Sequence, residues 1–364
     1  MKITCPKGQL LTAISHIQGA VSPRTTLPIL TNVLLEADKE ILTLTATDLD
    51  IGVQYRVPVT VSAPGATTLP ARRLFGIIKE LPEDIVEIEV SPNNVAVITC
   101  GSAYFKVVGL GREEFPRLPE FPDTKSFELP QELLREMINK TSYAMCRDES
   151  RYVLNGTYLI AKSGKVIMVS TDGRRLAFIE KHIDLPKSID MEAIIPAKAV
   201  QELTKLLETE GTVNVAMTKN QIAFRLPNCI LISRLIEGTF PNYKQVIPKD
   251  LEQKISLKKD ELLSAVKRAT LITNERSNSI KLNMGSGRLV ISANTPDVGE
   301  SRESINIPYK GKEIEIAFNP LFVIDVLRNL EDQEIILEIT DGVNPGIIRS
   351  GPEFLYVIMP MRLS

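Results

Sequence analysis

The sequence is poor in the residues that most often carry metal sites and catalysis. It has no tryptophan, two histidines and four cysteines among 364 residues. The cysteines lie far apart, and none belongs to a Cys-x-x-Cys pair: Cys5, Cys100, Cys146 and Cys229. This spacing predicts neither a disulfide framework nor a zinc site, and it indicates free thiols in a reducing compartment.

Motifs for catalysis are also missing. The sequence contains no phosphate loop, no dinucleotide-binding GxGxxG pattern and no GxSxG nucleophile elbow. His16 and His182 stand in dissimilar surroundings, which gives no pattern for a histidine base or a metal site. We therefore predict that the protein is not an enzyme and uses no cofactor.

Three acidic residues keep one enzymatic alternative open. Asp48, Asp50 and Asp172 could bind a metal ion in an enzyme that acts on nucleic acid. However, Thr47-Asp48 and Thr171-Asp172 occupy equivalent places at the end of the same predicted strand. Aspartate at such a place commonly forms an Asx turn, so the pattern favours turns over metal binding.

Long apolar runs are absent as well, since spanning a bilayer takes about 20 apolar residues and the sequence has no such run. The N-terminus lacks the apolar core of a signal peptide, so we expect a cytoplasmic protein.

The net charge of the chain is −2, because 43 lysines and arginines stand against 45 aspartates and glutamates. Any contact with nucleic acid then requires cations gathered on one face.

An internal repeat organises the chain. A segment with proline near a predicted helix start, followed by apolar residues at helical spacing, occurs three times. The copies read LPARRLFGIIKEL at 69–81, IPAKAVQELTKLL at 195–207 and FNPLFVIDVLRNL at 318–330. A second helical segment opens each unit: KGQLLTAI at 7–14, PQELLREM at 130–137 and KKDELLSAV at 258–266. Short alternating runs between and after these segments are typical of strands.

We therefore predict three copies of one unit of about 120 residues. Two helices that cover antiparallel strands in each copy make an α+β architecture. The boundaries are expected in the proline-rich stretches 113–123 and 238–250. The predicted domains are then 1–122, 123–249 and 250–364.

The second helix of each copy points a cation away from its apolar side. On a helical wheel the apolar residues of the first two copies gather on one side: Leu74, Ile77, Ile78, Leu81, Val200, Leu203 and Leu207. The equivalent outward position holds Lys79, Lys205 and Arg328 in the three copies. Any amphipathic helix has a solvated face, but solvation does not explain a positive charge in every copy. The pattern indicates contact with a nucleic-acid backbone without sequence readout.

The last segment, LYVIMPMRLS at 355–364, is aliphatic, whereas terminal segments are usually polar. Such a segment is either a buried strand or part of a surface that another molecule covers. Because alternate side chains of a strand point to opposite faces, one segment can serve both purposes.

Seven short stretches, in order and spread over the whole chain, resemble the bacterial sliding clamps, the beta subunits of DNA polymerase III. They are SPRTTLPIL at 22–30, TATDLD at 45–50, PGATTLPAR at 64–72, ESRYVLNG at 149–156, STDGRRLA at 170–177, GTFPNY at 238–243 and VIMPMRL at 357–363. The resemblance implies a DNA clamp fold in which two chains of three similar domains form a head-to-tail homodimer. Helices would line the hole of this six-domain ring, and sheets would lie outside.

The family's ring encircles double-stranded DNA without sequence specificity and acts as a processivity factor. Topological linkage needs no tight binding, which accounts for a net charge near zero. By resemblance, the residues expected to meet DNA are Arg24, Arg72, Lys79, Arg147, Tyr152, Lys198, Lys205 and Arg328.

The family also has a hydrophobic cleft that receives short linear motifs. These come from the catalytic subunit of DNA polymerase III, the clamp loader, other polymerases and repair proteins. The matching residues here are Leu154, Thr171, Gly173, Arg174, Arg175, Leu176, Pro241, Val246, Val357, Met359, Pro360, Met361 and Arg362. Exposed methionines suit such a cleft because they adapt to different ligands. Arg174 stands where some family members have histidine.

For the dimer, the family buries an apolar patch of one chain's first domain against the partner's third domain. The matching residues are Phe105 and Val107 on one side and Leu271 and Ile272 on the other. Ordinary core positions are the alternative for these residues. A monomeric peptide-binding module, in which the outward cations serve only solvation, remains the alternative for the whole protein.

Overall fold

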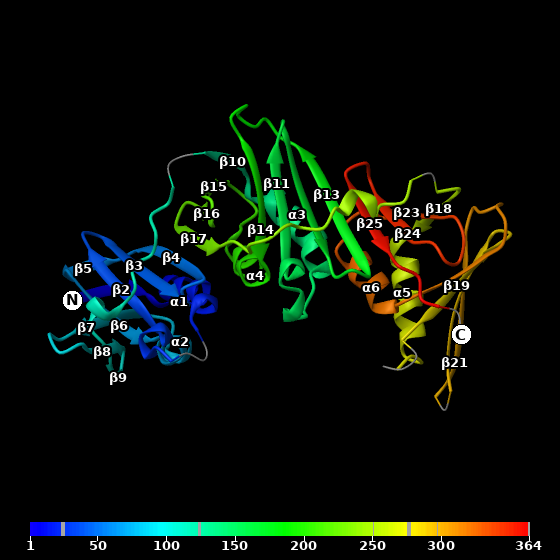
Figure 1. The fold of residues 1–364 in the computed structure, drawn as a ribbon. Helices are drawn as coiled ribbons and strands as arrows, with labels where there is room; N and C mark the ends of the chain where they lie inside the picture. Colours follow the sequence, from blue (N-terminus) through cyan, green and yellow to red (C-terminus); the bar gives the residue numbers. More distant parts are fainter. Residues whose placement is uncertain (23–25, 123–124, 250, 275–277, 297, 363–364) are drawn as a thin grey trace. The chain divides into compact units, whose positions relative to one another are not determined.

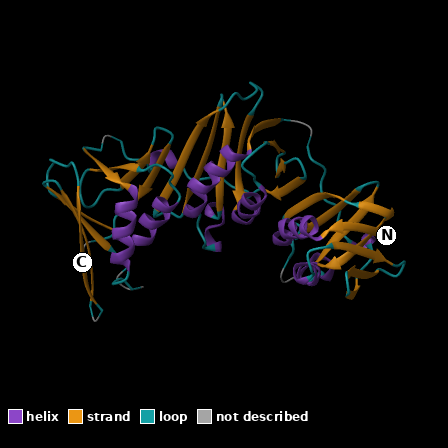
Figure 2. Cartoon of the chain, turned by 180° about the vertical axis from the view of Figure 1, so that it is seen from behind, coloured by secondary structure: helices purple, strands orange, loops and turns teal. Residues whose placement is uncertain are grey.

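The computed structural model describes residues 1–22, 26–122, 125–249, 251–274, 278–296 and 298–362. The chain divides into two compact units. Figure 1 shows the helices and strands of the chain, coloured along the sequence. The first unit comprises Met1–Arg135 and Lys198–Leu235, and the second comprises Glu136–Ala197 and Ile236–Ser364. Both units combine antiparallel sheets with helices, and in each the helices lie along the sheets (Figure 2). No helix in the described ranges is long and apolar enough to cross a membrane.

Two antiparallel sheets build the first unit. One sheet has the order β5 (Thr60–Ala63), β1 (Lys2–Pro6), β7 (Ile85–Val90), β8 (Val95–Cys100) and β9 (Ala103–Val108). The other has the order β10 (Ser126–Pro130), β15 (Thr212–Met217), β16 (Gln221–Arg225), β17 (Cys229–Arg234), β4 (Ile51–Pro58), β3 (Ile41–Thr47), β2 (Asn32–Asp38) and β6 (Gly65–Pro70). Strands far apart in sequence therefore meet where β17 pairs with β4.

The second unit repeats this plan. Its larger sheet has the order β14 (Asp190–Pro196), β11 (Gly156–Lys162), β12 (Lys165–Thr171), β13 (Arg175–His182), β25 (Phe354–Ile358), β24 (Gly346–Ser350), β23 (Glu334–Ile339) and β18 (Gln253–Lys258). The smaller sheet has the order β21 (Gly299–Asn306), β20 (Arg288–Thr295), β19 (Ile280–Gly285) and β22 (Ile314–Phe318). The pairing of β13 with β25 corresponds to that of β4 with β17.

Within the described residues, six α-helices accompany these sheets: α1 (Lys7–Ile17), α2 (Ala71–Glu80), α3 (Gln131–Thr141), α4 (Ala197–Leu206), α5 (Lys259–Thr270) and α6 (Pro320–Arg328). Proline precedes or opens five of them: Pro6, Pro70, Pro130, Pro196 and Pro320. Proline ends a strand because it donates no ladder hydrogen bond, and its fixed φ suits the first turn of a helix. Helix α1 packs with α2, and α5 packs with α6.

The helical periodicity in the sequence is confirmed by burial. Leu74 and Ile78 of α2 are fully buried, and Val200 and Leu203 of α4 are almost so. Each helix thus holds its unit together through one apolar side, which stabilises by about 1.5–3 kcal/mol for each fully buried large aliphatic side chain. The opposite side is left for solvent or a partner.

The predicted Asx turns are also confirmed. The Oδ1 atom of Asp48 accepts hydrogen bonds from the backbone N–H groups of Asp50 and Ile51 at 3.0 and 2.8 Å. In the second unit, Oδ1 of Asp172 accepts hydrogen bonds from the equivalent backbone N–H groups, those of Arg174 and Arg175, at 2.9 and 3.1 Å. The two turns therefore have the same geometry, as expected for copies of one unit.

Candidate functional site

The cations predicted to meet DNA differ in whether a carboxylate forms an ion pair with them. Arg72 and Lys79 are exposed on α2, and Arg328 is exposed in the last turn of α6. None of the three forms an ion pair with a carboxylate among the described residues. These three side chains are free to meet a phosphate, which is what backbone contact requires. Arg24 lies outside the described residues.

The two cations of α4 are already paired. Lys198 Nζ lies 2.5 Å from Oδ2 of Asp48, and Lys205 Nζ lies 2.7 Å from Oε1 of Glu202. Both lysines must exchange a carboxylate for a phosphate before they can contribute to DNA binding. The carboxylate of Asp48 therefore has two roles: it neutralises Lys198, and it accepts a backbone hydrogen bond within its own Asx turn.

The other acidic residues that could have bound a metal are engaged in the same way. Asp50 lies 3.5 Å from Nη1 of Arg234, and Asp172 lies 3.0 Å from Nε of Arg175. No group of three or more histidine, cysteine, aspartate or glutamate side chains suited to a metal ion occurs in the part of the chain that the structure describes.

A loop in the second unit carries the remaining two residues predicted to meet DNA. Arg147 and Tyr152 are both exposed there. The side chain of Asp148 accepts from the N–H of Ser150 at 3.0 Å and so begins the short helical segment Glu149–Leu154. The sequence reasoning missed Arg151, whose Nη1 donates to the backbone carbonyl of Asp172 at 3.1 Å. This bond ties the loop to the Asx turn.

The predicted cleft residues gather around strands β13 and β25. Apart from Arg175, we call them the partner surface: Leu154, Thr171, Gly173, Arg174, Leu176, Pro241, Val246, Val357, Met359, Pro360, Met361 and Arg362. Leu176 and Val357 are cross-strand neighbours and are almost fully buried, with Leu154 packed against them.

The exposed apolar part of the partner surface is its rim. The exposed fractions of Val246, Met359 and Met361 are 45%, 40% and 36%. The N–H of Met359 donates to the carbonyl of Arg174 at 2.9 Å, and the N–H of Met361 donates to the carbonyl of Ala317 at 2.8 Å. The tail is thus fixed through its backbone, while its side chains stay available. Part of the tail is a buried strand and part is an exposed surface.

A segment between the second and third repeats covers the rest of this sheet face. Phe240 and Tyr243 are buried against it, and the rings of Tyr158 and Phe240 stack with centroids 4.9 Å apart. Burial raises the pKa of the Tyr158 hydroxyl, which donates to the carboxylate of Glu192 at 2.6 Å. The aromatic packing fixes the neighbouring Pro241, an exposed member of the partner surface.

Arg175 differs from the other predicted cleft residues in where its side chain lies. It alternates with Leu176 along β13, so its side chain points to the opposite face. There Nη1 lies 2.7 Å from Oδ2 of Asp325, Nη2 donates to the carbonyl of Tyr143 at 2.6 Å, and the guanidinium lies 4.4 Å from the ring centroid of Phe322. Strand alternation therefore separates the Arg175 side chain from that of Leu176, and its place in the cleft stays a prediction.

Replacing Arg175 with methionine should lower the free energy of unfolding by about 3 kcal/mol, because two carboxylates lose a nearly buried partner. Denaturant unfolding measures this change. The matched control is Lys165→Met, which removes the surface pair of Lys165 with Glu180 and should cost at most about 1 kcal/mol. Equal losses in the two variants would show that the Arg175 network adds no stability.

One sheet edge and one helix end carry the residues predicted for the dimer. Strand β9 ends its sheet and exposes Tyr104, Phe105 and Val108, while Val107 is buried in the core. Leu271, which follows α5, is exposed and Ile272 is half-buried. Strand β21 ends the smaller sheet of the second unit. An unpaired edge strand can pair with another chain, and β9 adds exposed apolar side chains to such an edge.

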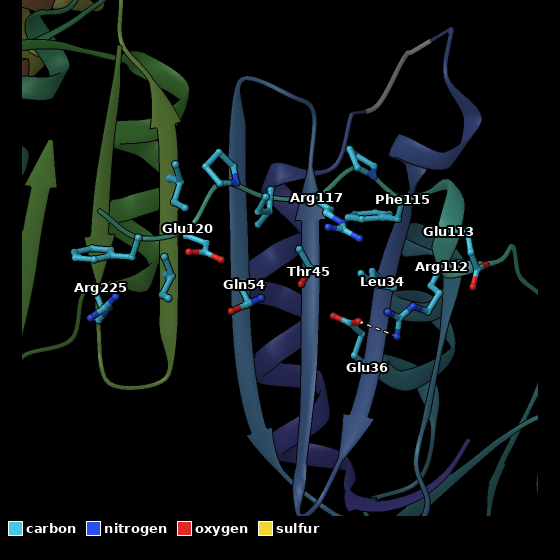
Figure 3. Close-up of a pocket in the computed structure, with 16 residues that line it drawn as sticks. Leu34, Glu36, Thr45, Gln54, Arg112, Glu113, Phe115, Arg117, Glu120 and Arg225 are labelled. Carbon is cyan, nitrogen blue, oxygen red and sulfur yellow. Dashed lines mark ion pairs between the residues drawn. The ribbon is translucent and has the colours of Figure 1, made fainter. Parts of the chain in front are cut away.

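The first unit contains a groove where the second has aromatic packing (Figure 3). Its volume is about 720 Å³, and it lies between the segment 112–121 and strands β2, β3, β4 and β17. By the repeat, Leu34 and Gln54 stand where Tyr158 and Phe178 stand in the second unit. The smaller side chains leave this space open, and Arg225 closes one end with its guanidinium 3.8 Å from the ring centroid of Phe121.

Comparisons with known proteins cover the whole chain. Models of the DNA polymerase III beta subunit match it in three parts: the N-terminal domain at 1–119, the central domain at 128–242 and the C-terminal domain at 244–362. A beta sliding clamp of Chlamydia pneumoniae is 40% identical over 363 residues, which cover 100% of this chain and 99% of the relative.

Solved structures agree with these matches. The DNA polymerase sliding clamp of Bacillus subtilis superposes with a TM-score of 0.94 at 32% identity, over 100% of both chains. A sliding clamp of Pseudomonas aeruginosa, solved bound to griselimycin, gives the same TM-score and identity, also over 100% of both chains.

Proposed function

Because this chain belongs to the family of the DNA polymerase III beta subunit, we propose which of its residues close the ring, meet DNA and take up partner proteins. Members of this family are sliding clamps, so the chain is a non-enzymatic processivity factor of DNA replication. As a clamp it acts as a homodimeric ring that binds DNA, the polymerase and other proteins.

The ring closes, in our proposal, where β9 of one chain pairs with β21 of a second chain. The order of strands is the observation that carries this proposal. The larger sheets each join two half-sheets, β10-β15-β16-β17 to β4-β3-β2-β6 and β18-β23-β24-β25 to β13-β12-β11-β14. The run β1-β7-β8-β9 has the same plan as the half-sheets β10-β15-β16-β17 and β18-β23-β24-β25. The run β21-β20-β19-β22 has the same plan as the half-sheets β4-β3-β2-β6 and β13-β12-β11-β14. Pairing β9 with β21 would complete a third sheet of the same plan.

Side chains beside these edges support the same pairing. Phe105 is exposed on β9, and Leu271 and Ile272 lie at the end of α5, as a buried apolar contact between chains requires. Val107 is already buried within its own unit, so we expect it to support the edge strand from the core.

The first experiment is small-angle X-ray scattering on the main peak from a sizing column. The proposal predicts twice the chain mass of 40.4 kDa and the scattering of a hollow ring. A compact monomer at micromolar concentration would contradict the proposed closure and favour a monomeric peptide-binding module.

We assign DNA contact to the outward cations of the second helices and to the loop with Arg147 and Tyr152. Arg72, Lys79 and Arg328 should contribute most, since no described carboxylate neutralises them. Arg73, exposed beside Arg72, is added to this set. Contacts of this kind with phosphates are weak and independent of sequence, which lets a clamp slide.

We further propose that short peptides dock on the partner surface, with apolar side chains against Val246, Met359 and Met361. The Pseudomonas aeruginosa clamp was solved bound to griselimycin, and we propose that this ligand binds the present chain at the partner surface, where it then serves as a probe. The fixed backbone of the tail keeps the rim in place without a ligand, which lowers the entropic cost of binding.

Replacing Val246 with glutamate should weaken griselimycin binding on the order of 100-fold, because a carboxylate would have to leave water against an apolar ligand. Isothermal titration calorimetry measures the affinity. The matched control is Ile85→Glu in the first unit, where the exposed fraction is 49%. The control Ile85→Glu should bind griselimycin as the unaltered protein does. Unchanged binding by Val246→Glu would show that griselimycin binds outside the partner surface.

Two finer assignments complete the proposal. We place the domain boundaries so that the domains are 1–122, 123–249 and 250–364, in the proline-rich connections. We place the protein in the cytoplasm, where a bacterial replication clamp meets the chromosome.

A further inference from the structure

The methionines of this chain are distributed unevenly between core and surface. The sequence has nine, and all of them lie in the described residues. Seven are buried or half-buried: Met1, Met137, Met145, Met168, Met191, Met217 and Met284. The two that remain exposed, Met359 and Met361, both belong to the partner surface. The thioethers most accessible to a solute therefore coincide with the proposed docking site.

The two thioethers are also held in place. Hydrogen bonds from the backbone N–H groups of Met359 and Met361 fix this short segment to the turn at Arg174 and to the end of β22. Pro360 between them restricts the backbone further. The main chain of this segment is thereby held at the surface, where the side chains of Met359 and Met361 are exposed.

We propose that Met359 and Met361 form an oxidation site through which peroxide weakens partner binding. A thioether sulfur attacks one oxygen of hydrogen peroxide, so that an S–O bond forms as the O–O bond breaks. The second oxygen leaves as hydroxide and takes the proton of the new S–OH group to give water. Sulfur is thereby oxidised to the sulfoxide, and peroxide is reduced to water.

The sulfoxide changes what the partner surface can bind. Its oxygen is a strong hydrogen-bond acceptor, and covering it with an apolar ligand removes it from water without a donor in return. The flexible apolar side chain becomes polar at the position where an apolar anchor docks. Because methionine sulfoxide reductases restore the thioether, the change is reversible. This inference rests on the proposed function of the partner surface.

The test uses the full-length dimer and griselimycin as the probe. Dilute hydrogen peroxide is applied, mass spectrometry of proteolytic peptides gives the extent of oxidation at each methionine, and calorimetry gives the affinity. Met359 and Met361 should oxidise before the seven other methionines. The affinity should fall at least about tenfold when both carry sulfoxide. Treatment with both epimer-specific reductases should restore it, and the dimer mass should stay constant.

Two variants separate the sites. The double variant Met359→Leu/Met361→Leu should have the same affinity for griselimycin before and after peroxide treatment. In Met217→Leu, which removes a half-buried methionine in the first unit, the affinity should fall as in the unaltered protein. Full oxidation of Met359 and Met361 without loss of affinity would overturn the inference, as would an equal loss in the double leucine variant. If the untreated protein does not bind griselimycin, the assignment of the partner surface fails, and the inference fails with it.

Discussion

Replacing Leu271 with arginine should convert the dimer into monomers and abolish retention on circular DNA. Leu271 is 79% exposed in the single chain, so the substitution leaves the fold of the second unit intact. In the dimer the same side chain is proposed to lie against the partner's first domain beside Phe105. A guanidinium there would have to leave water without a carboxylate partner, which costs several kcal/mol at each of two symmetric interfaces.

Sedimentation equilibrium measures the change in mass, and retention of the loaded protein on nicked circular DNA measures loss of the ring. Val343→Arg is the matched control, since Val343 is 80% exposed and lies in the turn between β23 and β24. It should remain a dimer and stay on DNA. A dimeric Leu271→Arg protein that still stays on DNA would place the interface elsewhere.

The second large effect is expected from reversing two of the unpaired cations, one on α2 and one on α6. The variant Lys79→Glu/Arg328→Glu removes four cations from each ring. The slope of log K against log salt for duplex DNA should fall by about 4, and the affinity near 0.1 M salt should drop by about 10²–10³-fold. Fluorescence anisotropy of a labelled duplex over a range of salt concentrations gives both quantities.

Lys205 is left out of this variant for a physical reason. Its ammonium group is the partner of the nearly buried Glu202, so its removal would destabilise the first unit as well as weaken DNA binding. Lys219→Glu/Lys310→Glu, two exposed lysines in turns, is the control with the same change in net charge. It should bind DNA almost as the unaltered protein does. Griselimycin affinity and dimer mass should stay constant in both variants, and a wild-type salt slope in the first would contradict the proposed DNA face.

Local patterns were sufficient to predict much of this protein. The buried sides of α2 and α4 follow from apolar residues at helical spacing, which any packed helix must place on one face. The turns at Asp48 and Asp172 follow from the hydrogen bonds that aspartate makes to its own backbone. Proline marks five helix starts because its chemistry acts within one or two residues.

Relations between distant residues could not be predicted in this way. Strand alternation separates Arg175 from Leu176, but the sequence does not say which of the two faces carries the core helices. The answer depends on Asp325, which is 150 residues away in the sequence and forms an ion pair with Arg175 in the same unit in which β13 pairs with β25. The pairing of Lys198 with Asp48 is equally remote, and it changes a predicted DNA contact into an ion pair that DNA must first break.

The sequence by itself determined the repeat, the helices and their buried sides, and the Asx turns. These features depend on neighbours along the chain, where periodicity and backbone hydrogen bonding act directly. Only the tertiary structure decided which cations are unpaired, which face of β13 holds Arg175, and that β9 and β21 each lie at the edge of a sheet. Those outcomes depend on the order in which distant strands pair, and strand order is set by the packing of the whole sheet.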